Sequence, residues 1–128
     1  GGLTPGLTMW AGPSKHFKTA FSLLMAKSYL DKYEDAVLLF YDSEFGTPQS
    51  YFDSFGIDTD RVLHTPITDV EQLKFDIMNQ LTNIDRDDHI IILIDCVYFF
   101  LLYYLYLTFV VTYIYLLFHQ YIFVIYCV

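Results

Sequence analysis

The stretch Gly12-Pro13-Ser14-Lys15-His16-Phe17-Lys18-Thr19 decides the fold of this chain. An apolar segment, Leu7–Ala11, precedes it, and a helical pattern follows it. A strand, a tight loop and a Lys-Thr pair at a helix N-terminus form the layout of a phosphate-binding P-loop. The sequence therefore predicts a binding site for a nucleoside triphosphate.

One position departs from the usual pattern, G-x-x-x-x-G-K-[ST]. The second glycine is replaced by Phe17. If the loop needs a positive φ at this position, an aromatic residue is disfavoured there. Either the loop tolerates a side chain at this position or the site is impaired.

The composition of the 128 residues changes abruptly at Asp95. All of the Asp, Glu, Lys, Arg, Gly, Pro, Met and Ala residues lie in 1–95, so the formal charge of −8 belongs to that part. Residues 96–128 are dominated by Tyr, Leu, Phe, Val and Ile. The net negative charge argues against nucleic-acid binding by residues 1–95 alone, because nucleic-acid-binding surfaces concentrate Lys and Arg.

Apolar runs alternate with helical patterns along residues 1–95. Short apolar runs without internal alternation are typical of parallel strands covered on both faces. Asp69 and Gln72 form a capping box at the start of one helix, and Gly56 is a left-handed C-cap of another. The order predicts a three-layer α/β sandwich with a mainly parallel sheet. The expected strands are 7–11, 37–41, 61–64 and 90–94, and the expected helices are 18–33, 48–55 and 70–84.

The ends of three predicted strands carry the residues that such chemistry needs. In a P-loop, Lys18 would reach the β- and γ-phosphates and the Thr19 hydroxyl would bind Mg²⁺. Asp95 ends the strand Ile-Ile-Ile-Leu-Ile-Asp in the manner of a Walker B acid, and could hold a water of the Mg²⁺. Glu44, just past the strand 37–41, could polarise the water that attacks the γ-phosphate, and Asp42 competes for that role. Suitable residues at three strand ends would lie at the same edge of the sheet. This convergence favours a nucleotide-binding site over a chance occurrence of each residue.

The histidines are not expected to take part in the chemistry. His16 in the loop and His64 near a strand end are interpreted as solvated or structural residues. No histidine or cysteine cluster has the spacing of a metal site, so no metal beyond a nucleotide-bound Mg²⁺ is predicted.

Residues 1–95 resemble the UvsX-like phage recombinases of the RecA family. The similarity is carried by Gly1-Gly2-Leu3-Thr4-Pro5-Gly6-Leu7-Thr8, by the loop Gly12–Thr19, by Leu39-Phe40-Tyr41-Asp42-Ser43-Glu44-Phe45-Gly46, by Val62-Leu63-His64-Thr65-Pro66 and by Asn79-Gln80-Leu81. A phosphate loop with Phe before the Lys is a feature of that phage group, which answers the objection raised by Phe17.

The resemblance implies an ATP-dependent DNA strand-exchange protein that forms filaments on single-stranded DNA, in the cytoplasm of the infected host cell. It implies a RecA-type P-loop NTPase core, truncated after the Walker B strand, with ATP and Mg²⁺ as cofactors. Gly12–Thr19 would bind the phosphates, Thr19 and Asp95 the Mg²⁺, Glu44 would activate the water, and Tyr51 would lie against the adenine. The DNA-binding loops of the family are absent from this chain, so we expect the fragment to be inactive although the parent family is a DNA-dependent ATPase.

The segment 96–128 has no counterpart in that family. The favoured interpretation is a T-rich DNA stretch read in the wrong frame or an unspliced intron, because the residue types used have T-rich codons. The alternative is a transmembrane helix, since about 20 apolar residues suffice to span a bilayer. No Lys or Arg follows the segment to orient it.

Two other functions remain open at this point. Another RecA-fold motor, such as a replicative helicase, would share the loop and the Walker B strand but should lack the match at Asp42–Gly46. A membrane-anchored nucleotide-binding protein would require the segment 96–128 to be genuine.

Overall fold

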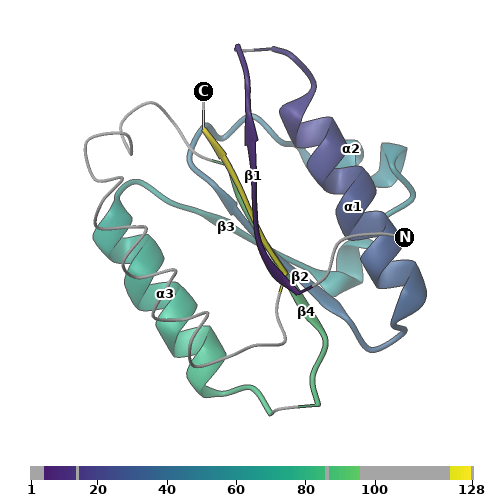
Figure 1. Ribbon diagram of the computed structural model, residues 1–128, viewed down its shortest axis with the longest axis vertical. Coiled ribbons are helices and arrows are strands. Elements are labelled where there is room, and N and C mark those ends of the chain that lie inside the picture. Colours follow the sequence, from purple (N-terminus) through teal and green to yellow (C-terminus); the bar gives the residue numbers. More distant parts are fainter. Residues whose placement is uncertain (1–4, 14, 86, 96–121, 128) are drawn as a thin grey trace.

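The computed structural model describes residues 5–13, 15–85, 87–95 and 122–127 (Figure 1). Helices and strands alternate along most of this length, as the sequence predicts. The elements are β1 (Gly6–Ala11), α1 (Lys18–Lys32), β2 (Val37–Asp42), α2 (Gln49–Ser54), a short 3₁₀ helix (Thr59–Arg61), β3 (Val62–Pro66), α3 (Val70–Thr82), β4 (Ile90–Asp95) and β5 (Ile122–Cys127).

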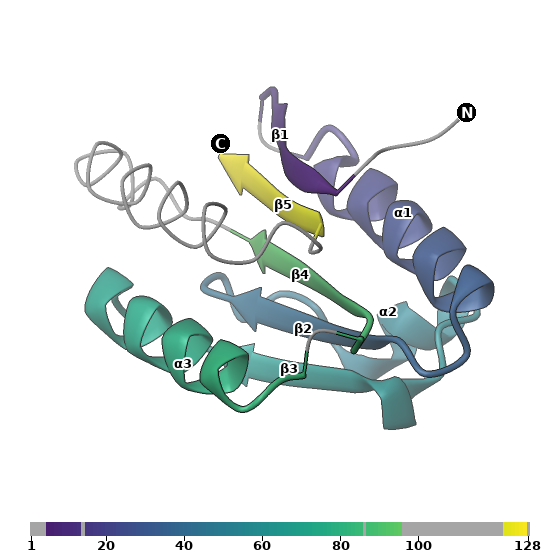
Figure 2. The same ribbon diagram turned by 60° about the horizontal axis from the view of Figure 1, so that its bottom comes forward.

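The described strands form one parallel sheet in the order β1-β5-β4-β2-β3 (Figure 2). β5 lies between β1 and β4, and it pairs with both along most of its length. The expectation of a sheet that ends with the strand 90–94 is therefore wrong, because a strand from the C-terminal segment completes it. As a result β4 is an inner strand with a partner on each side.

Helices cover both faces of the sheet, which gives three layers (Figure 1). On β2, Leu38 and Phe40 pack in the cluster with α1 and α2, whereas Leu39 and Tyr41 pack in the cluster with α3. Because successive side chains of a strand point to opposite faces, a strand covered on both sides must be apolar throughout. The predicted α/β architecture with a parallel sheet is confirmed.

The predicted start of α3 is confirmed, whereas the helix ends at Thr82, two residues before the expected end. Asp69 precedes this helix, and its side chain accepts a hydrogen bond from the backbone N–H of Gln72 over 2.8 Å. The side chain of Gln72 reaches back to the backbone N–H of Thr68, one residue before the position that a regular capping box uses. The Asp69 side chain thus satisfies an N–H group that a helix leaves unpaired at its start, and Gln72 ties the preceding residue to the same turn.

Two further details concern the connections after α1 and α2. Gly56 follows α2 with φ of 68°, as a left-handed cap requires. Arg61, predicted to begin a strand, instead ends the 3₁₀ helix, and β3 begins at Val62. Its guanidinium donates hydrogen bonds to the carbonyls of Leu30, Tyr33 and Ala36, at and just beyond the end of α1. These carbonyls have no partner within the helix, so Arg61 serves as the C-cap.

None of the described helices is long and apolar enough to cross a membrane. The transmembrane alternative concerns 96–128, of which 96–121 and 128 lie outside the described residues. Within that segment the structure assigns β5, a strand of the parallel sheet.

Candidate nucleotide-binding site

The candidate site lies where the parallel strands end and the segments after them begin. Asp42 and Asp95 are the last residues of the neighbouring strands β2 and β4 and face each other in the sheet register. The loop after β1 leads into α1, whose first residues are Lys18 and Thr19. In open parallel sheets, ligands bind outside these carboxyl ends.

The loop between β1 and α1 has an unusual backbone. Lys15 has φ of 65° and Phe17 has φ of 58°, and both lie in the left-handed region. A left-handed residue costs about 1–2 kcal/mol when it carries a Cβ. The loop therefore does use a positive φ where the usual pattern has glycine, and Phe17 adopts it. Ser14, the remaining residue of the predicted loop, lies outside the described residues.

The side chain of Lys18 closes this loop. Its ammonium donates hydrogen bonds to the backbone carbonyls of Gly12, at 3.1 Å, and Pro13, at 2.8 Å. A lysine at the N-terminus of a helix adds its positive charge to that of the helix dipole. The two carbonyls hold the ammonium across the loop, where an anion bound at the helix N-terminus would meet it.

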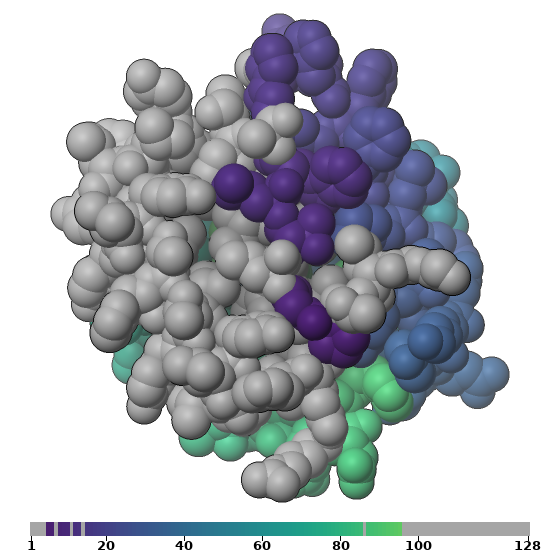
Figure 3. Space-filling view, viewed as in Figure 1, coloured from purple at the N-terminus to yellow at the C-terminus, as the bar shows by residue number. Residues whose placement is uncertain are grey.

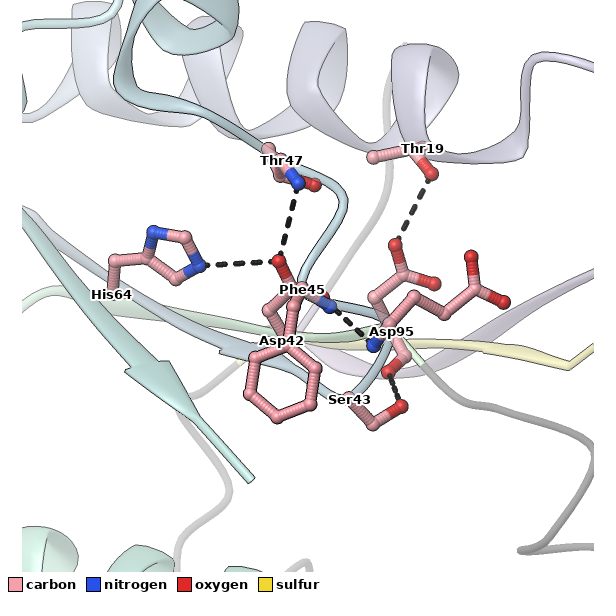
Figure 4. Close-up of polar contacts among 8 residues, drawn as sticks. Thr19, Asp42, Ser43, Phe45, Thr47, His64 and Asp95 are labelled. Carbon is pink, nitrogen blue, oxygen red and sulfur yellow. Dashed lines mark hydrogen bonds and ion pairs between the residues drawn. The ribbon is translucent and has the colours of Figure 1, made fainter. Parts of the chain in front are cut away.

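Thr19 joins α1 to the end of β4. Its hydroxyl donates a hydrogen bond to the Asp95 carboxylate over 3.3 Å, and that contact is drawn in Figure 4. A hydroxyl and a carboxylate are oxygen donors of the kind that Mg²⁺ prefers, alongside water and phosphate oxygens. The structure thus brings together the two residues that the sequence predicts as metal ligands.

The environment of Asp95 is short of positive charge. Burial, Glu44 and Asp42 raise the pKa of the Asp95 carboxyl from 3.8 to about 6, and the Thr19 hydroxyl and Lys18 oppose the rise. Crowded carboxylates that resist ionisation gain from a cation. Among the described residues, no three His, Cys, Asp or Glu side chains form a metal-binding group by themselves. The donor set at Thr19 and Asp95 therefore suits a cation that brings most of its own ligands, as Mg²⁺ does with water and phosphate.

Asp42 and Glu44 differ in their surroundings, although the sequence left both open for the same role. The Asp42 side chain is buried, and its carboxylate accepts hydrogen bonds from the backbone N–H groups of Glu44, Phe45 and Thr47. Glu44 is exposed and close enough to Asp95 to affect its pKa. This arrangement favours Glu44 over Asp42 as the carboxylate available to a bound water.

Three further residues, His64, Tyr51 and His16, lie outside the group formed by Lys18, Thr19 and Asp95. His64 lies 3.3 Å from the Asp42 carboxylate through Nε2, which is in line with the structural role that its sequence position suggests. It is the central residue of β3, next to β2 in the sheet. Tyr51 is half-buried on α2, where its ring packs edge-on against Phe55. His16 is an exposed residue of the loop.

The start of α1 presents aromatic side chains at the surface. Phe17 is 74 % exposed and Phe21 is 52 % exposed, and the Phe21 ring stacks on Trp10 of β1 at 5.7 Å between ring centres. In the space-filling view, β1 and the start of α1, in purple and blue, lie at the surface (Figure 3). The loop residues Lys15, His16 and Phe17 are all exposed.

Comparison with known proteins gives one informative match. No protein-family model matches the chain. Over 95 residues, or 74 % of the chain, the sequence is 50 % identical to the "Recombination and repair protein" of Enterobacteria phage T4. The chain spans 24 % of the length of that relative. The chain is thus similar to part of a phage protein of recombination and repair.

Proposed function

We propose that this chain binds ATP together with Mg²⁺ at the carboxyl edge of its sheet. The observation that carries the proposal is the pairing of Thr19 with Asp95, next to a loop that Lys18 closes. A turn-capping aspartate or an incidental lysine would explain each residue alone. Their convergence from β4 and from the first turn of α1 is what a nucleotide site requires.

The proposed binding step uses the residues in the following way. Lys18 would exchange the carbonyls of Gly12 and Pro13 for the phosphate oxygens, which offer stronger charge-assisted hydrogen bonds. The backbone N–H groups of the loop and of the start of α1 would bind the same phosphates. Thr19 and Asp95 would hold the Mg²⁺, which neutralises the charge of the phosphates.

Glu44 is the residue that we assign to the hydrolytic step. Its carboxylate would accept a proton from, or orient, the water that attacks the γ-phosphate. The exposure of Glu44 leaves room for that water, whereas the carboxylate of Asp42 is already occupied. We expect slow or no turnover from this chain alone.

The wider function that we propose is that of an ATP-dependent recombinase of the RecA family. The similarity to a phage recombination and repair protein supports it. Filament formation on single-stranded DNA would be a property of the whole protein. The formal charge of −8 makes the present chain a poor DNA-binding surface by itself.

Nucleotide binding can be tested directly on the full chain. A fluorescent adenine nucleotide with Mg²⁺ should bind, and Lys18→Ala should weaken binding at least about tenfold, because a charged hydrogen bond contributes about 1.5–3 kcal/mol. Lys27→Ala is the matched control, since Lys27 lies on the same helix but pairs with Asp31. Equal affinity in the two variants, or no binding by the unmodified chain, would refute the proposal.

A further inference from the structure

The segment after β2 folds around a single buried side chain. Asp42 is 1 % exposed. Its Oδ1 accepts hydrogen bonds from the backbone N–H of Glu44 at 3.0 Å and of Phe45 at 2.8 Å, and its Oδ2 accepts one from Thr47 at 3.3 Å. One carboxylate therefore accepts hydrogen bonds from three backbone N–H groups of the loop that contains Glu44; Figure 4 draws Asp42 with Phe45 and Thr47.

Asp42 is itself held from the neighbouring strand. Nε2 of His64 on β3 lies 3.3 Å from Oδ2, and the His64 ring meets the rings of Phe40 and Phe52 edge-on. The backbone carbonyl of Asp42 also accepts a hydrogen bond from Ile67, just beyond β3. These contacts hold Asp42 from the side of β3, while its carboxylate accepts hydrogen bonds from the loop after β2.

The loop that results has a backbone it would not adopt readily on its own. Phe45 has φ of 55° and is 64 % exposed, so packing of its side chain does not explain the left-handed conformation. The hydrogen bond from the Phe45 N–H to the Asp42 carboxylate explains this conformation. On the opposite side, Ser43 donates from both N and Oγ to the carbonyl of Asp95, which ties the loop to the end of β4.

We propose that Asp42 is the positioning residue of Glu44. Its hydrogen bonds fix the position of the Glu44 backbone and restrict its motion. His64 in turn holds the Asp42 carboxylate, and Asp42 takes no part in the reaction itself. The importance of this position for hydrolysis rests on the proposed function of Glu44, whereas the positioning itself does not.

The two oxygens of Asp42 make the proposal testable atom by atom in the nucleotide-free full chain. In Asp42→Asn, the remaining oxygen can still accept from Glu44 and Phe45, while the new NH₂ group meets the Thr47 N–H as a second donor. We expect amide exchange at Thr47 to accelerate at least about tenfold while Glu44 and Phe45 stay protected. In Asp42→Ala all three amides should lose protection, and the NMR order parameter of Glu44 should fall from about 0.85 to below about 0.6.

Asp76→Asn is the matched control, because Asp76 also bonds a strand residue, Tyr41, but on the α3 side of the sheet. It should leave the loop amides unchanged. Glu44 and Phe45 amides that stay ordered and protected in Asp42→Ala would overturn the proposal. If that variant does not fold, uniform loss of protection across Glu44, Phe45 and Thr47 in Asp42→Asn, in place of the split, would overturn it. Neither result depends on nucleotide binding, so failure of the proposed function at Lys18 would be seen separately.

Discussion

The hydroxyl of Thr19 donates a hydrogen bond to the carboxylate of Asp95 although 76 positions separate the two residues. The strand β1, which leads into the helix of Thr19, is not a neighbour of β4 either, since β5 lies between them. With strands spaced about 4.8 Å apart, the ends of β1 and β4 are roughly 10 Å from each other. The loop and the first turn of α1 cross that distance and bring Thr19 to Asp95.

The first prediction concerns the pH dependence of stability. Because the pKa of Asp95 is raised from 3.8 to about 6 in the folded chain, the folded state holds this proton more tightly than the unfolded state. Its contribution to stability is complete below about pH 4 and is lost as the pH rises through 6. Asp95→Asn stays neutral and still offers an oxygen to Thr19. Allowing for the partial exposure of Asp95, we expect the free energy of unfolding of Asp95→Asn to exceed that of the unmodified chain by about 1–2 kcal/mol at pH 7.5 without Mg²⁺.

Chemical denaturation of both chains at several pH values tests this. The stability difference between them should vanish near pH 4. A difference that stays constant from pH 4 to 7.5 would show that ionisation of Asp95 is not its cause.

The second prediction concerns the left-handed conformation at Phe17. Phe17→Gly and Phe17→Ala both remove the exposed ring, but only glycine removes the Cβ that makes φ of 58° costly. After allowance for the greater freedom of glycine in the unfolded chain, the glycine variant should be more stable than the alanine variant by up to about 1 kcal/mol. Thermal or chemical unfolding of the pair measures the difference. An alanine variant that is the more stable of the two would mean that the loop is not held in this conformation in solution.

Much of the fold could be predicted because it depends on local patterns. The runs at Val37–Asp42 and Ile90–Asp95 identify buried parallel strands by their continuous apolar character, and Asp69 marks a helix start by its capping chemistry. The meeting of Lys18, Thr19 and Asp95 could also be anticipated, since parallel strands end at one edge.

Other features depend on contacts between distant residues, which the sequence does not encode locally. The segment 96–128 is predominantly apolar and has no Asp, Glu, Lys or Arg, so no period or charge distinguishes Ile122–Cys127 as a strand or sets its register. The residue pattern names Glu44 and keeps Asp42 as a competitor, because only the folded loop shows that backbone N–H groups already occupy the Asp42 carboxylate. Arg61 was assigned to a strand since its role, the capping of α1, is fixed by a helix some 30 positions earlier.

The third prediction follows from that cap. Arg61 donates to the carbonyl of Leu30 at 3.1 Å and to that of Ala36 at 2.8 Å, and it also bonds Tyr33. Arg61→Ala should lower the free energy of unfolding by about 2–3 kcal/mol, because it removes a charged donor that three carbonyls share. Arg61→Lys should recover less than half of the loss, since an ammonium lacks the planar fork that reaches several carbonyls. Urea denaturation measures both, and a lysine variant as stable as the arginine chain would contradict the proposed cap.

The fourth prediction concerns β5, on which the spacing of the site depends. Val124 pairs with Thr8 of β1 on one side and with Leu93 of β4 on the other. Proline at an inner strand position removes a ladder hydrogen bond and clashes with its neighbours, at a cost of about 3 kcal/mol or more. Val124→Pro should therefore be less stable than Val124→Ala by at least that amount, since both variants lose the valine side chain but only proline breaks the ladder.

The same pair of variants separates a strand of the sheet from an incidental C-terminal segment. If β5 holds β1 and β4 apart, the proline variant should lose amide protection along both β1 and β4, while the edge strand β3 is affected less. If the proline and alanine variants unfold at the same urea concentration and protect these amides equally, β5 does not pair as the sheet order requires. The contact between Thr19 and Asp95 would then have to form without a strand between β1 and β4.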